Sequence, residues 1–138
     1  GGGPDENYYK EKIRLLKLSD RWFFHKKVKY ENLLLITASA DLGCALIEPS
    51  CVNNYYALPN KIFEYAACGL PVISSDLPSM SFYIKKYNLG ESVNILHKKT
   101  LYQKIHSLLK RKDTFSQKNS LNNLSWESQE KIFLQNFN

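Results

Sequence analysis

Apolar residues along the chain follow two patterns, a helical spacing and short continuous runs. Tyr9, Ile13 and Leu16 stand at positions i, i+4 and i+7, the spacing of an amphipathic helix. The runs 42–47 and 70–74 do not alternate with polar residues, which is typical of parallel strands covered on both faces. Together with turn residues, these patterns predict helices over residues 5–18, 30–39, 59–68, 79–87, 98–112 and 125–137. They predict short strands over residues 22–24, 42–47, 70–74 and 92–95.

The order of these elements predicts the fold class. Strands separated by helical segments of such lengths favour an α/β fold, a doubly wound parallel sheet with right-handed crossovers. The helix over 59–68 has the clearest ends, because Pro59 suits the first helical position and Gly69 stands just beyond the last one.

The loop after the strand that ends at Ile47 is the first candidate for function. Ligands of open parallel sheets bind beyond the carboxyl ends of the strands. Residues 48–58 form a loop of about 11 residues, whereas strand-to-helix loops usually have 2 to 6, and this length indicates a functional loop. Free backbone N–H groups around Ala57, Asn60 and Lys61 would form a phosphate site at the helix start, and Lys61 adds a positive charge.

Glu64 lies four residues after Asn60 and so on the same helix face. Helical side chains lean toward the N-terminus, so the Glu64 carboxylate points back toward the proposed phosphate site. A carboxylate can accept two hydrogen bonds from the hydroxyls of a ribose. A nucleotide site and a capped helix with a solvated Glu64 and Lys61 are both compatible with these residues.

Composition limits the class of protein. The chain has 138 residues, 43% of them hydrophobic, which fits one packed domain and excludes disorder for most of its length. The longest apolar run, Leu33 to Ile36, is far too short to span a membrane. The N-terminus is polar and acidic and carries no visible export signal, and no initial Met is present. Three cysteines without a Cys-x-x-Cys pair favour reduced thiols in a cytoplasmic protein.

A net charge of +6 permits phosphate-bearing partners. The basic helix over 98–112 is either a solvated surface or a contact with anionic lipid. Nucleic acid is not expected as a partner, because aromatic residues are not interleaved with the basic ones. The three histidines are scattered, and no Gly-x-Ser-x-Gly motif or Cys/His pair occurs, so the sequence predicts neither a protein-held metal nor covalent hydrolase chemistry.

Residues 58–78, LPNKIFEYAACGLPVISSDLP, resemble the nucleotide-sugar-binding segment of GT-B glycosyltransferases of the group 1, retaining kind. The resemblance extends to Gly1–Pro4, Trp22–Val28 and Ser125–Glu127, and so covers almost the whole chain. It implies that residues 1–138 form part of a Rossmann-like C-terminal domain that binds the donor nucleotide.

The resemblance also implies an activity. The enzyme would be a glycosyltransferase of the hexosyltransferase type, which moves a sugar from a nucleotide diphosphate to a polysaccharide or glycolipid acceptor. Such enzymes generally need no metal or other cofactor. The expected location is cytoplasmic, at the inner face of a membrane. The 138-residue chain alone is expected to bind its donor weakly and to transfer nothing.

Individual residues take roles by position in the resemblance. Glu64 would bind the ribose, and the backbone near Ala57 and Leu58 would meet the diphosphate. The turn that contains Lys27 and Val28 would border the nucleobase, largely through main-chain groups.

The chain departs from the family pattern at several points. Tyr56 stands where many relatives have a second glutamate that faces the donor sugar, and Glu48 is too far upstream to align with it. The family's first two strands, the basic pair that binds the diphosphate and the N-terminal acceptor domain are expected to be missing. Their loss predicts a sheet of about four strands, or a second copy that covers the open edge. A non-catalytic nucleotide-binding or protein-interaction module is the alternative, and Tyr56 is its best support.

Overall fold

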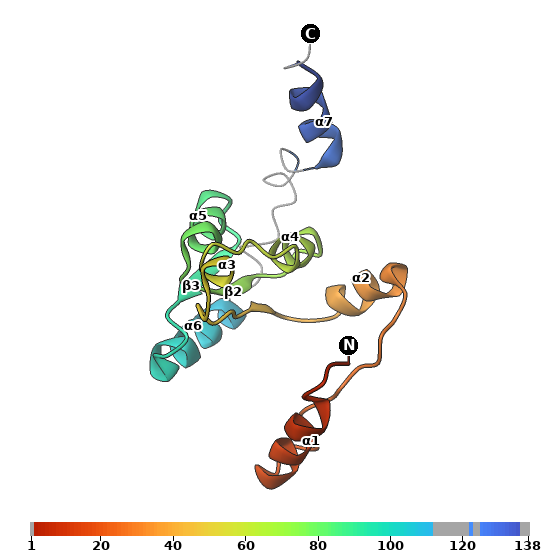
Figure 1. Cartoon of the computed structure of the whole chain (residues 1–138), viewed down its shortest axis with the longest axis vertical. Helices are drawn as coiled ribbons and strands as arrows, with labels where there is room; N and C mark the ends of the chain where they lie inside the picture. The colour runs from red at the N-terminus through yellow and green to blue at the C-terminus, as the bar shows by residue number, and fades with distance from the viewer. Residues whose placement is uncertain (1, 112–121, 123–124, 136–138) are drawn as a thin grey trace. The chain divides into compact units, whose positions relative to one another are not determined.

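The structure is a computed structural model that describes residues 2–111, 122 and 125–135 (Figure 1). The chain divides into two units, residues 1–33 and 34–138, and each is described by itself. No helix in the described residues is long and apolar enough to cross a membrane.

The N-terminal unit contains the predicted first helix. Helix α1 spans Glu6–Leu15, and its one buried side chain is Ile13. The Lys10 ammonium pairs with the Glu6 carboxylate at 2.5 Å, one turn away on the exposed surface. This pair lowers the pKa of the Glu6 carboxyl, chiefly through the hydrogen bond from Lys10. The helix prediction over 5–18 is therefore confirmed, with the end three residues earlier.

The strand predicted over Trp22–Phe24 is wrong. These residues have no regular secondary structure, and the side chains of Trp22 and Phe23 are 56% and 81% exposed. Aromatic residues favour a strand only where they can pack against a neighbouring strand. The described part of the N-terminal unit contains helices and loops but no strand, so this stretch has no partner strand there.

The second unit is built on a parallel sheet. Strands β1 (Gly43–Ala45), β2 (Val72–Ser75) and β3 (Gly90–Val93) pair in the order β1-β2-β3. Ile73 of β2 lies opposite Cys44 on one side and Glu91 on the other. The described residues thus form three strands instead of the four that were expected, because residues 22–24 contribute none.

Six helices accompany the sheet along the chain. They are α2 (Tyr30–Ala38), α3 (Val52–Tyr55), α4 (Lys61–Ala67), α5 (Pro78–Lys86), α6 (Lys98–Lys110) and α7 (Trp126–Gln135). All but α3 were predicted. Helix α3 was missed because its four residues are too few to show a helical spacing of apolar positions.

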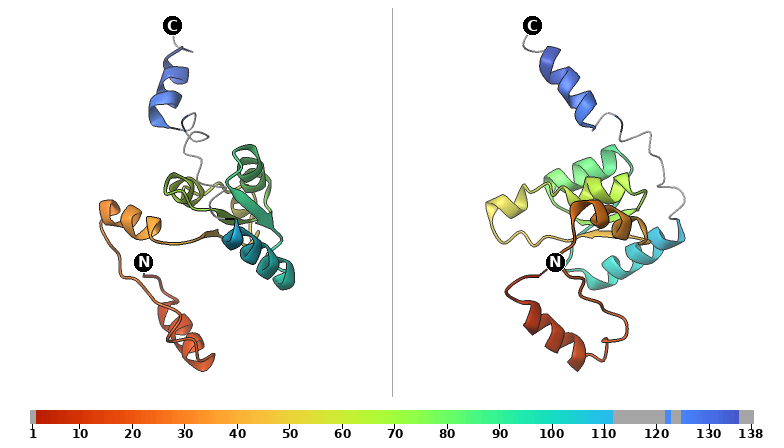
Figure 2. Two further views of the ribbon diagram at one scale, coloured as in Figure 1. Left: turned by 180° about the vertical axis from the view of Figure 1, so that it is seen from behind. Right: turned by 90° about the vertical axis from the view of Figure 1, so that its right-hand side faces the viewer.

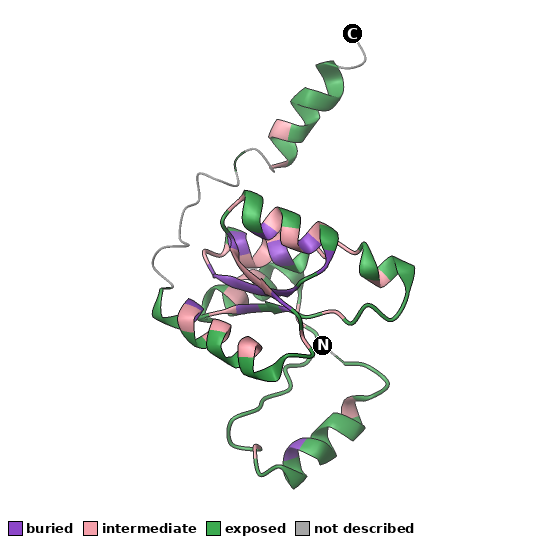
Figure 3. Ribbon diagram, turned by 90° about the vertical axis from the view of Figure 1, so that its left-hand side faces the viewer, coloured by how far each residue is buried: buried purple, intermediate pink, exposed green. Residues whose placement is uncertain are grey.

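Helices cover both faces of the sheet (Figure 2). On one face, Val72 packs with Ile62 of α4 and Met80 of α5, and all three side chains are fully buried. On the other face, Ile73 packs with Leu108 of α6. Burial of each such side chain contributes about 1.5–3 kcal/mol to folding. The buried residues gather in the strands and on the helix faces toward them (Figure 3), which confirms the α/β fold.

Gly90 at the start of β3 lies in close contact with the backbone of β2, and a substitution there tests this contact. Its φ is +153°, and a Cβ there would collide with the carbonyl oxygen and backbone nitrogen of Val72 in the neighbouring strand. We expect Gly90→Ala to lower the free energy of unfolding by about 2–4 kcal/mol, because backbone atoms cannot yield as a side chain can. Urea unfolding followed by circular dichroism measures the change.

Gly3→Ala is the matched control. No heavy atom lies within 4 Å of a Cβ built at Gly3, so its unfolding curve should be that of the parent chain. Equal stability of the Gly90→Ala and Gly3→Ala variants would contradict the close contact between β2 and β3.

Candidate functional site

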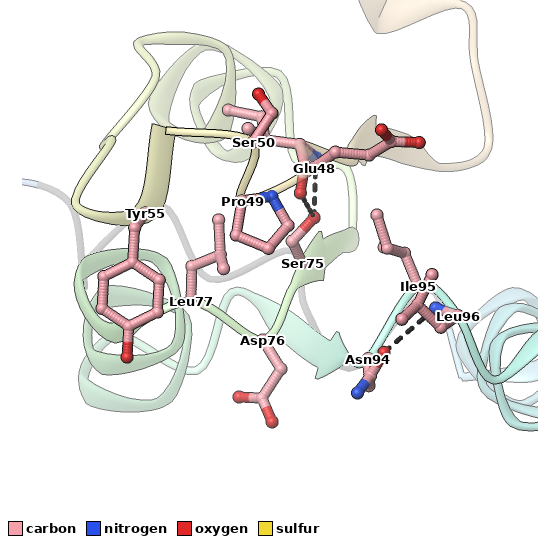
Figure 4. Close-up of a pocket in the computed structure, with 11 residues that line it drawn as sticks. Glu48, Pro49, Ser50, Tyr55, Ser75, Asp76, Leu77, Asn94, Ile95 and Leu96 are labelled. Carbon is pink, nitrogen blue, oxygen red and sulfur yellow. Dashed lines mark hydrogen bonds between the residues drawn. The ribbon is translucent and has the colours of Figure 1, made fainter. Parts of the chain in front are cut away.

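A cavity of about 400 Å³ lies at the carboxyl edge of the sheet (Figure 4). Its lining comes from the carboxyl ends of the three strands. The lining residues are 47–50 in the loop after β1, 75–77 at the end of β2 and just beyond it, and 94–96 after β3. Tyr55 of α3 completes the lining. We call this the edge cavity. It lies where parallel α/β sheets bind their ligands, as the sequence led us to expect.

The Ser75 hydroxyl holds the base of the edge cavity together. The Ile47 N–H donates to Ser75 Oγ at 2.6 Å, and Ser75 Oγ donates to the Ile47 carbonyl oxygen at 2.7 Å. Ser75 is 2% exposed, so these bonds form away from water. They tie the end of β1 to the end of β2 and fix the point where the loop 48–60 leaves the sheet.

Two carboxylates and an amide stand around the edge cavity. Asp76 Oδ1 accepts a hydrogen bond from Ser81 Oγ at 2.6 Å, which orients the carboxylate. Asn94 Oδ1 accepts from the Leu96 N–H at 3.0 Å, which leaves the two amide hydrogens of Asn94 to donate elsewhere. Glu48 contributes the second carboxylate. The lining contains no Lys, Arg or His, so the edge cavity carries negative charge only.

The loop from β1 to α4 is anchored beside the edge cavity. The rings of Tyr55 and Tyr56 meet edge to face with their centroids 4.9 Å apart. Ser79 Oγ of α5 donates to the Tyr56 carbonyl oxygen at 3.0 Å. Leu58 packs against the core beneath α4 and α5. These contacts hold Tyr56, Ala57 and Leu58 in one defined stretch before α4.

Helix α4 begins at Lys61, two residues later than predicted. The carbonyl oxygens of Pro59 and Asn60 accept the first helical hydrogen bonds, from Ile62 and Phe63. Asn60 and Lys61 are exposed at this end of the helix. The prediction of a free N–H group at Ala57 is wrong, because this N–H donates to the Asn54 carbonyl oxygen at 3.3 Å at the end of α3.

Glu64 is half-buried in the first turn of α4. No hydrogen bond or ion pair in the described structure involves its carboxylate. Burial raises the pKa of the neighbouring Tyr65 hydroxyl, and the charges of Cys44 and Glu64 raise it further. The Glu64 carboxylate is therefore available to a ligand.

The predicted residues fall into two groups. Tyr56, Ala57, Leu58, Asn60, Lys61 and Glu64 lie on one continuous segment next to the edge cavity, although none of them lines it. Lys27 and Val28 belong to the N-terminal unit, where Lys27 borders a separate cavity of about 200 Å³ with Gly2, Glu6 and Phe24.

Sequence reasoning missed Asp76 and Asn94 as site residues. The signal was only partly present: the observed strands β2 and β3 end directly before Asp76 and Asn94, but the predicted strand 70–74 ended two residues before Asp76 and the predicted strand 92–95 included Asn94. The search for function went to the longest loop, whereas the edge cavity collects the ends of all three strands.

The described residues contain no group of three or more His, Cys, Asp or Glu side chains arranged to hold a metal ion. Burial raises the pKa of the Cys44 thiol, which favours the protonated form over the reactive thiolate.

Comparison with known proteins identifies the family. The family described as glycosyl transferases, group 1, matches residues 1–111. The chain belongs to the group 1 glycosyltransferases. The matched range contains the whole edge cavity and the segment that carries Glu64.

Curated relatives of this glycosyltransferase chain are identical to it at about a third of the aligned positions. It is 38% identical over 74 residues to an Arabidopsis thaliana protein named UDP-glycosyltransferase TURAN, a match that covers 54% of this chain and 15% of the relative. It is 32% identical to the chitobiosyldiphosphodolichol beta-mannosyltransferases of Yarrowia lipolytica and Dictyostelium discoideum, over 60% and 64% of this chain and 17% of each relative. The chain thus matches less than a fifth of the length of these relatives. No solved structure matches it significantly.

The Ser75 bridge generates a stability prediction. Ser75→Ala removes the hydroxyl that bonds the N–H and the carbonyl of the half-buried Ile47, so the free energy of unfolding should fall by about 1–3 kcal/mol. The Ile47 amide should also exchange with deuterium faster. Urea unfolding and hydrogen exchange measure the two effects.

Ser50→Ala is the control, since Ser50 is exposed and its hydroxyl accepts a bond only from the exposed Asn54 among the described contacts. It should change stability by less than about 0.5 kcal/mol. Unaltered exchange at Ile47 in Ser75→Ala would contradict the proposed bridge.

Proposed function

We propose that this chain is the donor-binding part of a glycosyltransferase and that the segment 56–64 holds the nucleotide diphosphate. The observation that carries the proposal is the Glu64 carboxylate, half-buried, without a described hydrogen bond, and one turn into the helix that follows the carboxyl-edge loop. Membership of the group 1 glycosyltransferases supports a sugar nucleotide as the ligand.

The side chains and backbone of the segment 56–64 match the ribose and the diphosphate of a sugar nucleotide. The Glu64 carboxylate would accept hydrogen bonds from two ribose hydroxyls. Lys61 and the backbone N–H group of Leu58, next to Ala57, would neutralise the diphosphate. In our proposal, the turn at Lys27 and Val28 contacts the nucleobase.

Transfer breaks the bond between the anomeric carbon and the diphosphate, while the oxygen of an acceptor hydroxyl bonds to that carbon and its proton passes to an oxygen of the leaving diphosphate. Negative charge develops on the leaving diphosphate, so Lys61 and nearby N–H groups would stabilise the transition state more than the bound donor. No residue of the chain is assigned as general base.

The names of two relatives support a class of acceptor. Both are named for a dolichol-linked acceptor, which supports a glycolipid over a free sugar. We propose hexosyl transfer to a glycolipid or polysaccharide by the whole enzyme. Donor binding is the step that the present chain can test.

Glu64→Gln tests the nucleotide site. We expect it to weaken binding of UDP, GDP or ADP sugars by roughly 10- to 100-fold, because it removes charge-assisted hydrogen bonds to the ribose. Titration of the 138-residue chain with each sugar nucleotide, followed by NMR shifts at residues 56–64, measures the affinity. Glu130→Gln, an exposed carboxylate on α7, is the control and should bind like the parent chain.

The salt dependence of binding distinguishes a specific nucleotide site from non-specific attraction to a basic surface. A response that moderate salt abolishes and that ignores Glu64→Gln would mean non-specific attraction by the net charge of +6. No response to any of the three nucleotides would favour an interaction module instead.

A membrane contact through α6 is a second part of the proposal. Its exposed positions include Lys98, Lys99 and Lys110, and no acidic residue occurs between Ser92 and Arg111. The apolar side of the helix packs on the sheet through Leu108, so the contact would be electrostatic. Such a surface suits an enzyme that works on a lipid-linked acceptor.

Replacement of Lys98, Lys99 and Lys110 by Gln tests this surface. Each lysine near an anionic bilayer contributes about 1 kcal/mol, so the apparent affinity for phosphatidylserine-rich vesicles should fall on the order of 100-fold. Vesicle flotation at low salt measures it. The control replaces Lys10, Lys12 and Lys17, which makes the same change in net charge in the N-terminal unit. An equal loss of vesicle affinity in both triple variants would show that the net charge of the chain, and not the surface of α6, determines vesicle binding.

A further inference from the structure

Phe82 is an exposed aromatic residue on the outward side of α5. Met80 and Ile84, two positions before and after it, are buried in the core, whereas the Phe82 side chain is 57% exposed. A helix that covers a sheet normally has polar residues on this side. Neither the fold nor the proposed nucleotide site makes use of the Phe82 ring.

Three further rings lie next to Phe82. Tyr83 contacts Phe82 edge to face with the ring centroids 5.3 Å apart, and it contacts Phe63 of α4 in the same way at 5.7 Å. Tyr87 stacks on Tyr83 at 6.0 Å. Phe63, Tyr83 and Tyr87 are half-buried. A single exposed ring is common on protein surfaces, but a connected group of rings is typical of an interaction site.

Two lysines make the same surface positive. The Lys86 ammonium lies 5.4 Å from the centroid of the Phe82 ring and 5.2 Å from that of the Tyr87 ring. Lys85 is exposed beside it, and neither lysine forms an ion pair with another described residue. No acidic residue occurs between positions 77 and 90. We call this group the α5 surface, and it consists of Phe63, Phe82, Tyr83, Lys85, Lys86 and Tyr87.

The charge of the α5 surface limits the kinds of partner that fit it. A second copy of the chain has the same net charge of +6 and would be repelled on approach. A neutral sugar chain could stack on the rings but would leave the two ammonium groups without counter-charges. A protein segment that combines carboxylates with an apolar side chain matches both the lysines and the rings.

The position of the α5 surface favours a protein over a membrane. Helix α6, which carries the lysines that we propose to contact a bilayer, packs on the opposite face of the sheet (Figure 2). When α6 lies on a bilayer, the α5 surface therefore faces away from it. A soluble partner can reach the α5 surface in that arrangement.

We propose that the α5 surface binds an acidic segment of a partner protein. Carboxylates of that segment would pair with Lys85 and Lys86, and an apolar side chain would pack against the Phe82 ring. This interaction goes beyond donor binding and requires no nucleotide at residues 56–64.

A peptide of defined composition tests the α5 surface. The probe is a fluorescein-labelled peptide rich in glutamate and aspartate that carries two phenylalanines, and fluorescence anisotropy gives its affinity for the 138-residue chain. Phe82→Ala should weaken binding roughly 5- to 20-fold, because the ring is the proposed anchor. The double variant Lys85→Gln, Lys86→Gln should weaken it by a similar factor and reduce its dependence on salt.

Variants on α6 are the matched controls. The double variant Lys98→Gln, Lys99→Gln removes two positive charges, as the α5 double variant does, and Tyr102→Ala removes a ring that is 69% exposed. Both should keep the peptide affinity of the parent chain within about twofold, because they lie on the other side of the sheet. A peptide with serines in place of the phenylalanines should bind more weakly and be insensitive to Phe82→Ala. Circular dichroism and thermal unfolding establish that each variant is folded.

The outcomes separate the alternatives. Absence of peptide binding overturns the proposal, and so do equal losses of affinity in the α5 and α6 lysine variants, which would show an effect of net charge alone. Loss of affinity for phosphatidylserine-rich vesicles in Phe82→Ala, with peptide binding unchanged, overturns it in favour of a membrane contact. A dimer of the parent chain that dissociates in Phe82→Ala, measured by sedimentation, overturns it in favour of a second copy. Shifts caused by sugar nucleotides at residues 56–64 should be the same in Phe82→Ala and the parent chain, so the two proposals fail separately.

Discussion

The pairing of β2 with strands on both sides is the constraint on which the rest of the structure depends. Val72 and Ile73 lie next to each other on β2 and are fully buried on opposite faces, one under α4 and α5 and the other under α6. A strand so enclosed cannot slip by one residue, because every side chain would move to the wrong face. The register of β1 and β3 follows from that of β2.

This register determines where the candidate site can form. Parallel strands end at the same edge, so the residues after β1, β2 and β3 meet there although about 50 positions separate Ile47 from Asn94 in the chain. Ser75, the last residue of β2, extends the connection by binding the backbone of Ile47. The position of the loop that leads to Glu64 therefore depends on hydrogen bonds made inside the sheet.

The same reasoning explains which predictions succeeded. The runs over 42–47 and 70–74 were predicted as strands, and each contains one. All four residues of β2 are buried as predicted, whereas Cys44 of β1 is exposed, so the prediction of cover on both faces is wrong for β1. Trp22 and Phe23 also favour strands, but the part of the chain that the structure describes offers them no partner strand, and they form none. Asp76 could not be assigned to a site from its own neighbours, because its significance comes from Asn94 and Glu48 on other loops.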